Sequence, residues 1–344
     1  MSPPPLPRLD LPGWAFDLLT LGLVDHPTAV DAYVRARIDD YMEASQGRYT
    51  VVYRTGDPPV DYTVQVSVLP FFRRASGWAP QEGDSEVFLE RVLEDTGIGG
   101  KAFRHSARMC AYGRGSPEDL ARVTQALIDK GKLEEIRANF EFPNFSQEVF
   151  GAIYGGVSNN PLSLQDEIKL LQWEYGLGVD CAGYVQQAFL AVHGGTRRQW
   201  GFESIGQERL EHLKGNSAFS RTSPDQARPG DLLILDPPKG DTAGHTVLIR
   251  DRTELTDTER QDLPGIDGFA APTDTVHRIE VDASWGAGYG NLDSGGVQRR
   301  AFLYNETTGE WADVNAKTHQ VTQDAGKEGP YNGHPVQGIY HPKR

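Results

Sequence analysis

The chain has 344 residues, with 34 Lys and Arg against 48 Asp and Glu, so its formal net charge is -14 at pH 7. This acidic balance argues against a nucleic-acid-binding surface and gives no reason to expect binding to anionic membranes or wall polymers. Two cysteines are too few for a disulfide framework, and no Cys/His cluster has metal-ligand spacing, so we expect neither a metal nor a cofactor.

The start of the chain lacks the pattern of an export signal. Residues 1–12 are rich in proline and have neither the basic nor the apolar region of a signal peptide, and no apolar run is long enough to span a bilayer. We therefore expect a protein that is cytoplasmic or is exported by a dedicated secretion system. Its oligomeric state is left open.

Residues 1–145 are expected to form a separate α+β domain of unknown role. Apolar periodicity predicts helices at 29–41, 86–95 and 117–130. Alternation of apolar and polar residues predicts strands at 49–53 and 62–69. Ser116 precedes the third helix as its predicted N-cap. The second domain is expected over 146–344, because Pro143 interrupts a helix and Ser146 can cap the next.

The most informative motif is Asp180-Cys181-Ala182-Gly183. Apolar residues follow it at helical spacing, which predicts that Cys181 lies in the first turn of a helix. Free backbone N–H groups and the positive end of the helix dipole favour the reactive thiolate there, and they can receive a developing oxyanion. Gly183 would leave room for a substrate carbonyl. A small buried structural residue is the alternative for a cysteine on such a helix.

Two buried strands are predicted after this helix, separated by a loop. The turn Arg228-Pro229-Gly230-Asp231 leads into residues 232–235, and Gly244-His245 opens residues 245–249. A histidine at the start of a strand can lean toward a packed helix, as a general base for a cysteine must. An incidental surface histidine is the alternative.

A further strand is predicted within residues 276–286, and its alternation puts Asp282 and Ser284 on one face. Asp282 is a candidate to accept a hydrogen bond from the imidazole and fix its tautomer, the alternative being a solvated carboxylate. Ser284 and Trp285 adjoin the glycine-rich stretch 286–296, so they are candidates to line the cleft.

In this order the motifs resemble the NlpC/P60 family of papain-like cysteine peptidases. The resemblance implies a cysteine-bearing helix packed on an antiparallel sheet, with Cys181 as nucleophile, His245 as base and Asp282 as orienting group. It also implies Asp180 and Tyr154, the latter within an aromatic-Gly-Gly segment, as substrate-binding residues. The implied substrate is a peptidoglycan fragment or another peptide.

The chain departs from the family pattern at three positions and in the interval from Gly156 to Asp180, which is longer than usual. Ala182 replaces the usual serine, and Ala152 stands where many members have a substrate-binding tyrosine. Asp282 stands where histidine, asparagine or glutamine is more common. Residues 194–228 read as an insertion that could fold over the cleft as a cap.

The expected activity is thiol-dependent hydrolysis of an amide bond. A peptidoglycan stem-peptide endopeptidase or amidase is the first interpretation, because the resemblance implies that substrate class. The alternative is a transglutaminase-like acyltransferase or deamidase acting on a protein target, for which Asp282 is a suitable third residue. A catalytically inactive binding module is a further interpretation, of a different class.

Overall fold

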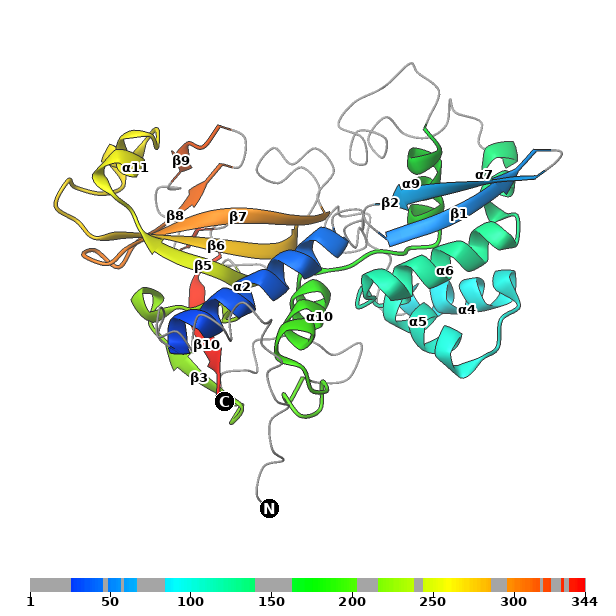
Figure 1. Cartoon of the computed structure of the whole chain (residues 1–344), viewed down its shortest axis with the longest axis horizontal. Helices are drawn as coiled ribbons and strands as arrows, with labels where there is room; N and C mark the ends of the chain where they lie inside the picture. The colour runs from blue at the N-terminus through cyan, green and yellow to red at the C-terminus, as the bar shows by residue number, and fades with distance from the viewer. Residues whose placement is uncertain are drawn as a thin grey trace. The chain divides into compact units, whose positions relative to one another are not determined.

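The computed structural model describes residues 26–45, 49–56, 59–66, 84–139, 163–202, 216–237, 244–285, 296–315, 318–322, 329–330 and 334–343. In these residues the chain is a mixed α+β protein, with a helical region followed by an eight-stranded antiparallel sheet and its packed helices (Figure 1). The predicted α+β class is confirmed. The domain boundary predicted near residue 145 lies outside the described residues and stays a prediction.

The chain divides into two compact units, each built from separate segments. The sheet unit combines Met1–Tyr41, Ala188–Asp282 and Arg299–Arg344. The helical unit combines Met42–Gln187 and Ala283–Gln298.

The helical unit contains a hairpin and five complete helices among its described residues. They are β1 (Tyr49–Thr55), β2 (Val60–Val66), α4 (Asp84–Thr96), α5 (Lys101–Ala111), α6 (Pro117–Asp129), α7 (Lys132–Asn139) and α9 (Leu164–Glu174). The two strands pair antiparallel, with Val51 opposite Val64. Gln125 of α6 completes the backbone bonding of Val52, since its amide accepts from the N–H at 2.7 Å and donates to the carbonyl at 2.9 Å.

Local sequence chemistry explains where α6 begins. The Ser116 side chain accepts the Asp119 N–H, and the Asp119 carboxylate accepts the Ser116 N–H, which is a capping box. Pro117 occupies the first helical position, where a missing N–H costs nothing. The cap predicted at Ser116 is therefore confirmed.

The sheet has the strand order β3-β10-β4-β5-β6-β7-β8-β9. Its strands are β3 (Phe219–Thr222), β4 (Leu232–Leu235), β5 (His245–Glu254), β6 (Val276–Trp285), β7 (Gly296–Asn305), β8 (Trp311–Val314), β9 (Val321–Thr322) and β10 (Val336–Pro342). All four residues of β4 are buried, as expected for a strand in the middle of a sheet. Gly230 precedes β4 with φ 88°, a left-handed conformation that the predicted Pro-Gly turn supplies.

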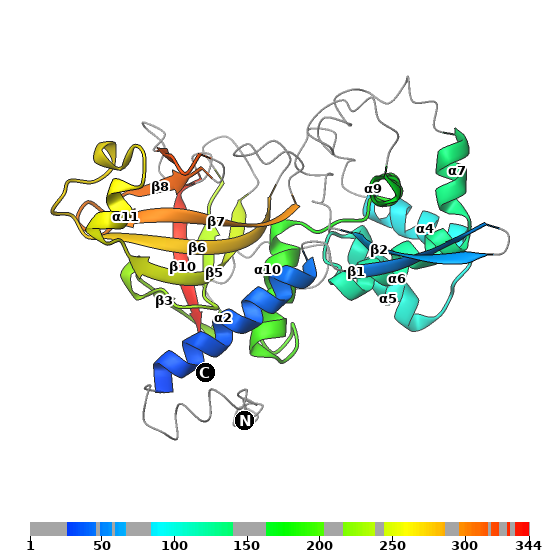
Figure 2. The same ribbon diagram turned by 45° about the horizontal axis from the view of Figure 1, so that its top comes forward.

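Three helices and two 3₁₀ turns accompany the strands among the described residues. They are α2 (His26–Ser45), α10 (Cys181–His193), α11 (Asp257–Gln261) and two short 3₁₀ turns, η3 (Pro224–Gln226) and η4 (Ile266–Gly268). Within the sheet unit, α2 lies beside β5 (Figure 2). Two ion pairs join them: Arg35 binds Asp251 at 2.9 Å, and Asp39 binds Arg250. Among the described residues, no helix is both long and apolar enough to cross a membrane.

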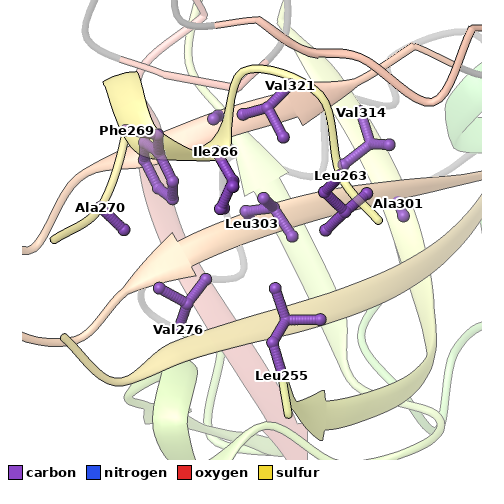
Figure 3. Close-up of a cluster of buried hydrophobic side chains, with 11 residues drawn as sticks. Leu255, Leu263, Ile266, Phe269, Ala270, Val276, Ala301, Leu303, Val314 and Val321 are labelled. Carbon is purple, nitrogen blue, oxygen red and sulfur yellow. The ribbon is translucent and has the colours of Figure 1, made fainter. Parts of the chain in front are cut away.

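One apolar core of the sheet unit lies where η4 and the chain on either side of it cover the strands (Figure 3). Its side chains are Leu255, Leu263, Ile266, Phe269, Ala270, Val276, Ala301, Leu303, Ala312, Val314 and Val321. The chain between β5 and β6 therefore acts as a cover for the sheet. Periodicity in the sequence did not predict this short helical segment.

A second apolar group surrounds Phe189 of α10. The rings of Trp200, Phe202 and Phe219 lie 5.0, 5.5 and 5.6 Å from the Phe189 ring. Phe202 and Phe219 are almost fully buried. These aromatic side chains, which belong to the predicted insertion, therefore pack against Phe189 of α10. Residues 203–215 of the predicted insertion lie outside the described residues.

Candidate functional site

Cys181 is the first residue of α10, a helix of 13 residues. Asp180 immediately before it acts as the N-cap, because its carboxylate accepts the Gly183 N–H at 2.6 Å and its carbonyl accepts the Tyr184 N–H at 2.9 Å. Cys181 itself is partly exposed. The first-turn position predicted for the cysteine is confirmed.

The Asp180 carboxylate also pairs with Arg114, from the loop between α5 and α6. Both side chains lie in a buried environment, with 2% of Arg114 and 10% of Asp180 exposed. One carboxylate oxygen is thus shared between a guanidinium and a helix N–H. The structure gives Asp180 a capping and ion-pairing role, and the predicted contact with a substrate amine stays a prediction.

Gly183 faces protein backbone. A Cβ atom on Gly183 would lie 2.0 Å from the Gly113 carbonyl oxygen, far inside van der Waals contact. The space that the sequence analysis assigned to a substrate carbonyl is therefore filled by the chain itself. Glycine is required here because α10 begins against the backbone of the Gly113–Arg114 loop.

Ser284 and Trp285 are buried at the end of β6. Ser284 Oγ donates to the Val179 carbonyl at 2.6 Å, one residue before the N-cap. Trp285 is fully buried, and its indole N–H donates to the Gln298 carbonyl at 2.8 Å. Both side chains support the chain around the cysteine helix and β7, and contact of either with a substrate stays a prediction. The fourth substrate-binding candidate, Tyr154, lies outside the described residues.

His245 opens β5 in the sheet unit, opposite Leu235 of β4. Burial lowers the pKa of its imidazole to about 3, and electrostatic interaction with Arg300 and with the protonated form of His334 acts in the same direction. The imidazole is therefore neutral at pH 7 and in the form that accepts a proton. The strand-start position predicted for this histidine is confirmed.

Asp282 lies on the other face of the sheet from His245. Asp282 stands opposite Leu248 of β5, so those two side chains lie on the same face of the sheet. His245 lies three residues before Leu248 on the same strand, with no break in the register between them. Because side chains alternate along a strand, His245 and Leu248 lie on opposite faces. Both oxygens of the Asp282 carboxylate accept hydrogen bonds from Arg299, at 2.8 and 2.9 Å. The geometry argues against Asp282 as the group that orients His245, because alternation along the strand points the two side chains apart.

Two further side chains, His334 and Arg300, affect the pKa of His245, and neither was predicted as a site residue. Val336, Leu235 and His245 stand in one row across β10, β4 and β5, and His334 comes two residues before Val336. The His334 Nδ1–H donates to the Asp236 carbonyl at 2.9 Å. The dipeptide Gly333-His334 has the same form as Gly244-His245, and this was the signal that could have identified it.

The two cysteines differ in environment. Cys110, in α5, is fully buried, and burial raises the pKa of its thiol well above the ordinary value, so it is held as a neutral apolar side chain. Cys181 is partly exposed at a helix N-terminus. Among the described residues, no group of three His, Cys, Asp or Glu side chains is arranged to hold a metal ion.

No known protein family, curated protein or solved structure matches the chain. Chemically, the helical unit supplies an accessible thiol at a capped helix start, and the sheet unit supplies a neutral, proton-accepting imidazole. Action of these two groups on one substrate stays a prediction.

Proposed function

We propose that the protein is a thiol-dependent amide hydrolase, with Cys181 as nucleophile and His245 as general base. The observation that carries the proposal is the place of Cys181, a partly exposed thiol at the first position of a helix. The dipole at a helix N-terminus stabilises a negative sulfur and the oxyanion of a tetrahedral intermediate. Cys110 has neither exposure nor such a position.

The reaction proceeds in two halves. His245 accepts the proton of the Cys181 thiol, and the resulting thiolate attacks the amide carbonyl carbon. The C–N bond then breaks, and the amine leaves with that proton from the His245 imidazolium. Neutral His245 then accepts a proton from water, which attacks the thioester and releases the acid and the thiol. Because burial lowers the pKa of His245, its imidazole is neutral at physiological pH and is in the form that can accept a proton.

The substrate class is a peptide, with peptidoglycan stem peptides first, on the resemblance to NlpC/P60 peptidases. The fold supports this to the level of a mixed α+β protein with an antiparallel sheet. The acyltransferase alternative was favoured by Asp282 as third residue. Since Asp282 is held by Arg299, no observation now favours that alternative over hydrolysis.

Incubation with purified muropeptides tests the proposal, with products resolved by mass spectrometry. Wild-type protein and the Cys110→Ala variant should release the same products, and Cys181→Ala should release none. Equal product formation by wild type and Cys181→Ala would refute the hydrolase proposal. A primary amine added to the same reaction would be incorporated into the product if the protein transfers acyl groups, and that result would replace hydrolysis by transfer.

Alkylation tests the nucleophile separately from the substrate. Iodoacetamide at about pH 6 should modify Cys181 faster than free cysteine and much faster than Cys110, as read from the two tryptic peptides. A Cys181 that reacts no faster than free cysteine would count against its activation. This measurement needs no substrate.

A further inference from the structure

The α5–α6 loop of the helical unit makes a continuous set of contacts with the start of the cysteine helix. The Gly113 carbonyl accepts the Asp180 N–H at 3.0 Å, and Arg114 pairs with Val179 in a short antiparallel bridge. Farther along α10, the Gln187 side chain donates to the Arg114 carbonyl at 2.9 Å. Contacts on both sides of Cys181 therefore set the position of this helix start.

The loop that makes these contacts is itself well fixed. Gly113 has φ 71°, and its N–H and that of Arg114 bond back to the carbonyls of Cys110 and Met109, at 3.0 and 2.8 Å. The capping box at Ser116 follows at once. Because α5 and α6 fix this loop at both ends, the loop can hold the residues that it contacts in a defined position.

Arg114 adds charge to this contact. The Asp180 carboxylate lies next to Cys181 in sequence and bonds the same helix turn, so on its own it would disfavour a negative sulfur. The Arg114 guanidinium pairs with that carboxylate and offsets its charge. The helix start thus keeps its cap without presenting a net negative charge beside the thiol.

We infer that Arg114 is a positioning residue for Cys181, and that the helical region serves as the support that sets the reactivity of the thiol. The inference rests on the proposed function in taking Cys181 as the nucleophile. It assigns a role to the N-terminal helices, for which the sequence offered none. Arg114 acts through Asp180, and its side chain makes no contact with substrate in this account.

The test is the pH profile of Cys181 alkylation in the full-length protein, with folding checked by circular dichroism. Arg114→Met should move the midpoint of the profile to higher pH and lower the rate at about pH 6 by roughly threefold to tenfold, because the Asp180 charge is then uncompensated. Arg114→Lys should restore much of the rate. The matched control is Arg91→Met, which removes an arginine paired with Glu174 on the surface of the same unit and should leave the profile unchanged.

A second variant separates charge from structure. Asp180→Asn in the Arg114→Met background should return the midpoint toward that of the wild type, because asparagine also caps helices but carries no charge. Asp180→Asn alone should move the midpoint to lower pH, which keeps the inference testable if Arg114→Met fails to fold. Profiles that do not change in the folded variants would overturn the inference. A slow wild-type Cys181 would instead refute the proposed function.

Discussion

Each compact unit contains an aspartate, buried or nearly so, that is paired with an arginine, and the two pairs have different roles. In the helical unit, Arg114 pairs with Asp180, which also caps the helix that begins at Cys181. In the sheet unit, Arg299 makes two hydrogen bonds to Asp282 and a third to Asp39 of α2, at 2.6 Å. The first pair lies at the start of the cysteine helix, and the second joins α2 to the strands of the sheet.

The neighbours of each carboxylate account for the difference. Asp282 is completely buried, and burial raises its pKa although both hydrogen bonds to Arg299 act to lower it. Its charge is therefore stabilised by Arg299 against a strong desolvation penalty. The sequence presents Asp180 and Asp282 alike, each near an element start or end, and only the three-dimensional partners distinguish them.

The largest expected effect is the loss of the pair in the sheet unit. Arg299→Met leaves Asp282 as a buried charge without its partner and removes a bond to Asp39, so the free energy of unfolding should fall by about 3–5 kcal/mol. Denaturant unfolding at 25 °C measures this. The double variant Arg299→Met/Asp282→Asn should recover part of the loss.

The matched control is Arg54→Met, which breaks an exposed pair with Asp61. That substitution should change stability little, since water screens exposed pairs. A loss on Arg299→Met as small as the loss on Arg54→Met would show that the buried pair does not hold α2 to the sheet.

The second effect is acid sensitivity caused by His245. Because its pKa is about 3 in the folded protein against about 6.5 when unfolded, only the unfolded chain binds a proton between those values, and stability falls as pH falls. The loss from pH 6.5 to pH 4 is roughly 3 kcal/mol. In His245→Gln the melting temperature should fall less over this range than in the wild type. Parallel curves for the two proteins would contradict the buried, neutral imidazole.

Much of the local structure could be predicted from the sequence. The hairpin at Val51, the cap at Ser116, the helix start at Cys181 and the strand start at His245 all follow from patterns within a few residues. Such features depend on periodicity, turn residues and capping groups, which are visible in a short window.

The partners of the polar side chains could not be predicted in the same way. Arg299 meets Asp282 across neighbouring strands, and Arg114 meets Asp180 from 66 residues away. Strand register and helix packing determine these contacts, and a one-residue change in register would reverse the face on which Asp282 lies. For the same reason, the sequence did not predict that His334 acts on His245. The two residues are far apart in the sequence, and the pairing of β10 with β4 is a feature of the sheet.

The third effect concerns the close approach of Gly183 to the α5–α6 loop. Gly183→Ala places a methyl group 2.0 Å from the Gly113 carbonyl oxygen, and backbone must shift to relieve it. Overpacking of this kind destabilises by about 1–3 kcal/mol, and the displaced helix start should also slow alkylation of Cys181. Gly99→Ala is the control, because no atom lies within 4 Å of its added Cβ. Equal behaviour of the two variants would show that α10 does not depend on this contact.

The smallest expected effect comes from comparing two helix caps: Ser116, which is neutral, and Asp180, which carries a charge beside the Cys181 thiol. Ser116 caps α6 with a neutral hydroxyl, two residues after Arg114. Ser116→Ala should lower the free energy of unfolding by about 1 kcal/mol, the usual contribution of an N-cap, and should leave the pH profile of Cys181 alkylation where it is. Asp180→Ala also removes a cap, but it leaves the buried Arg114 charge without its carboxylate and should change that profile. If Ser116→Ala shifted the profile as much as Asp180→Ala, general loosening of the loop would explain both, and the charge of Asp180 would have no separate part in the reactivity of Cys181.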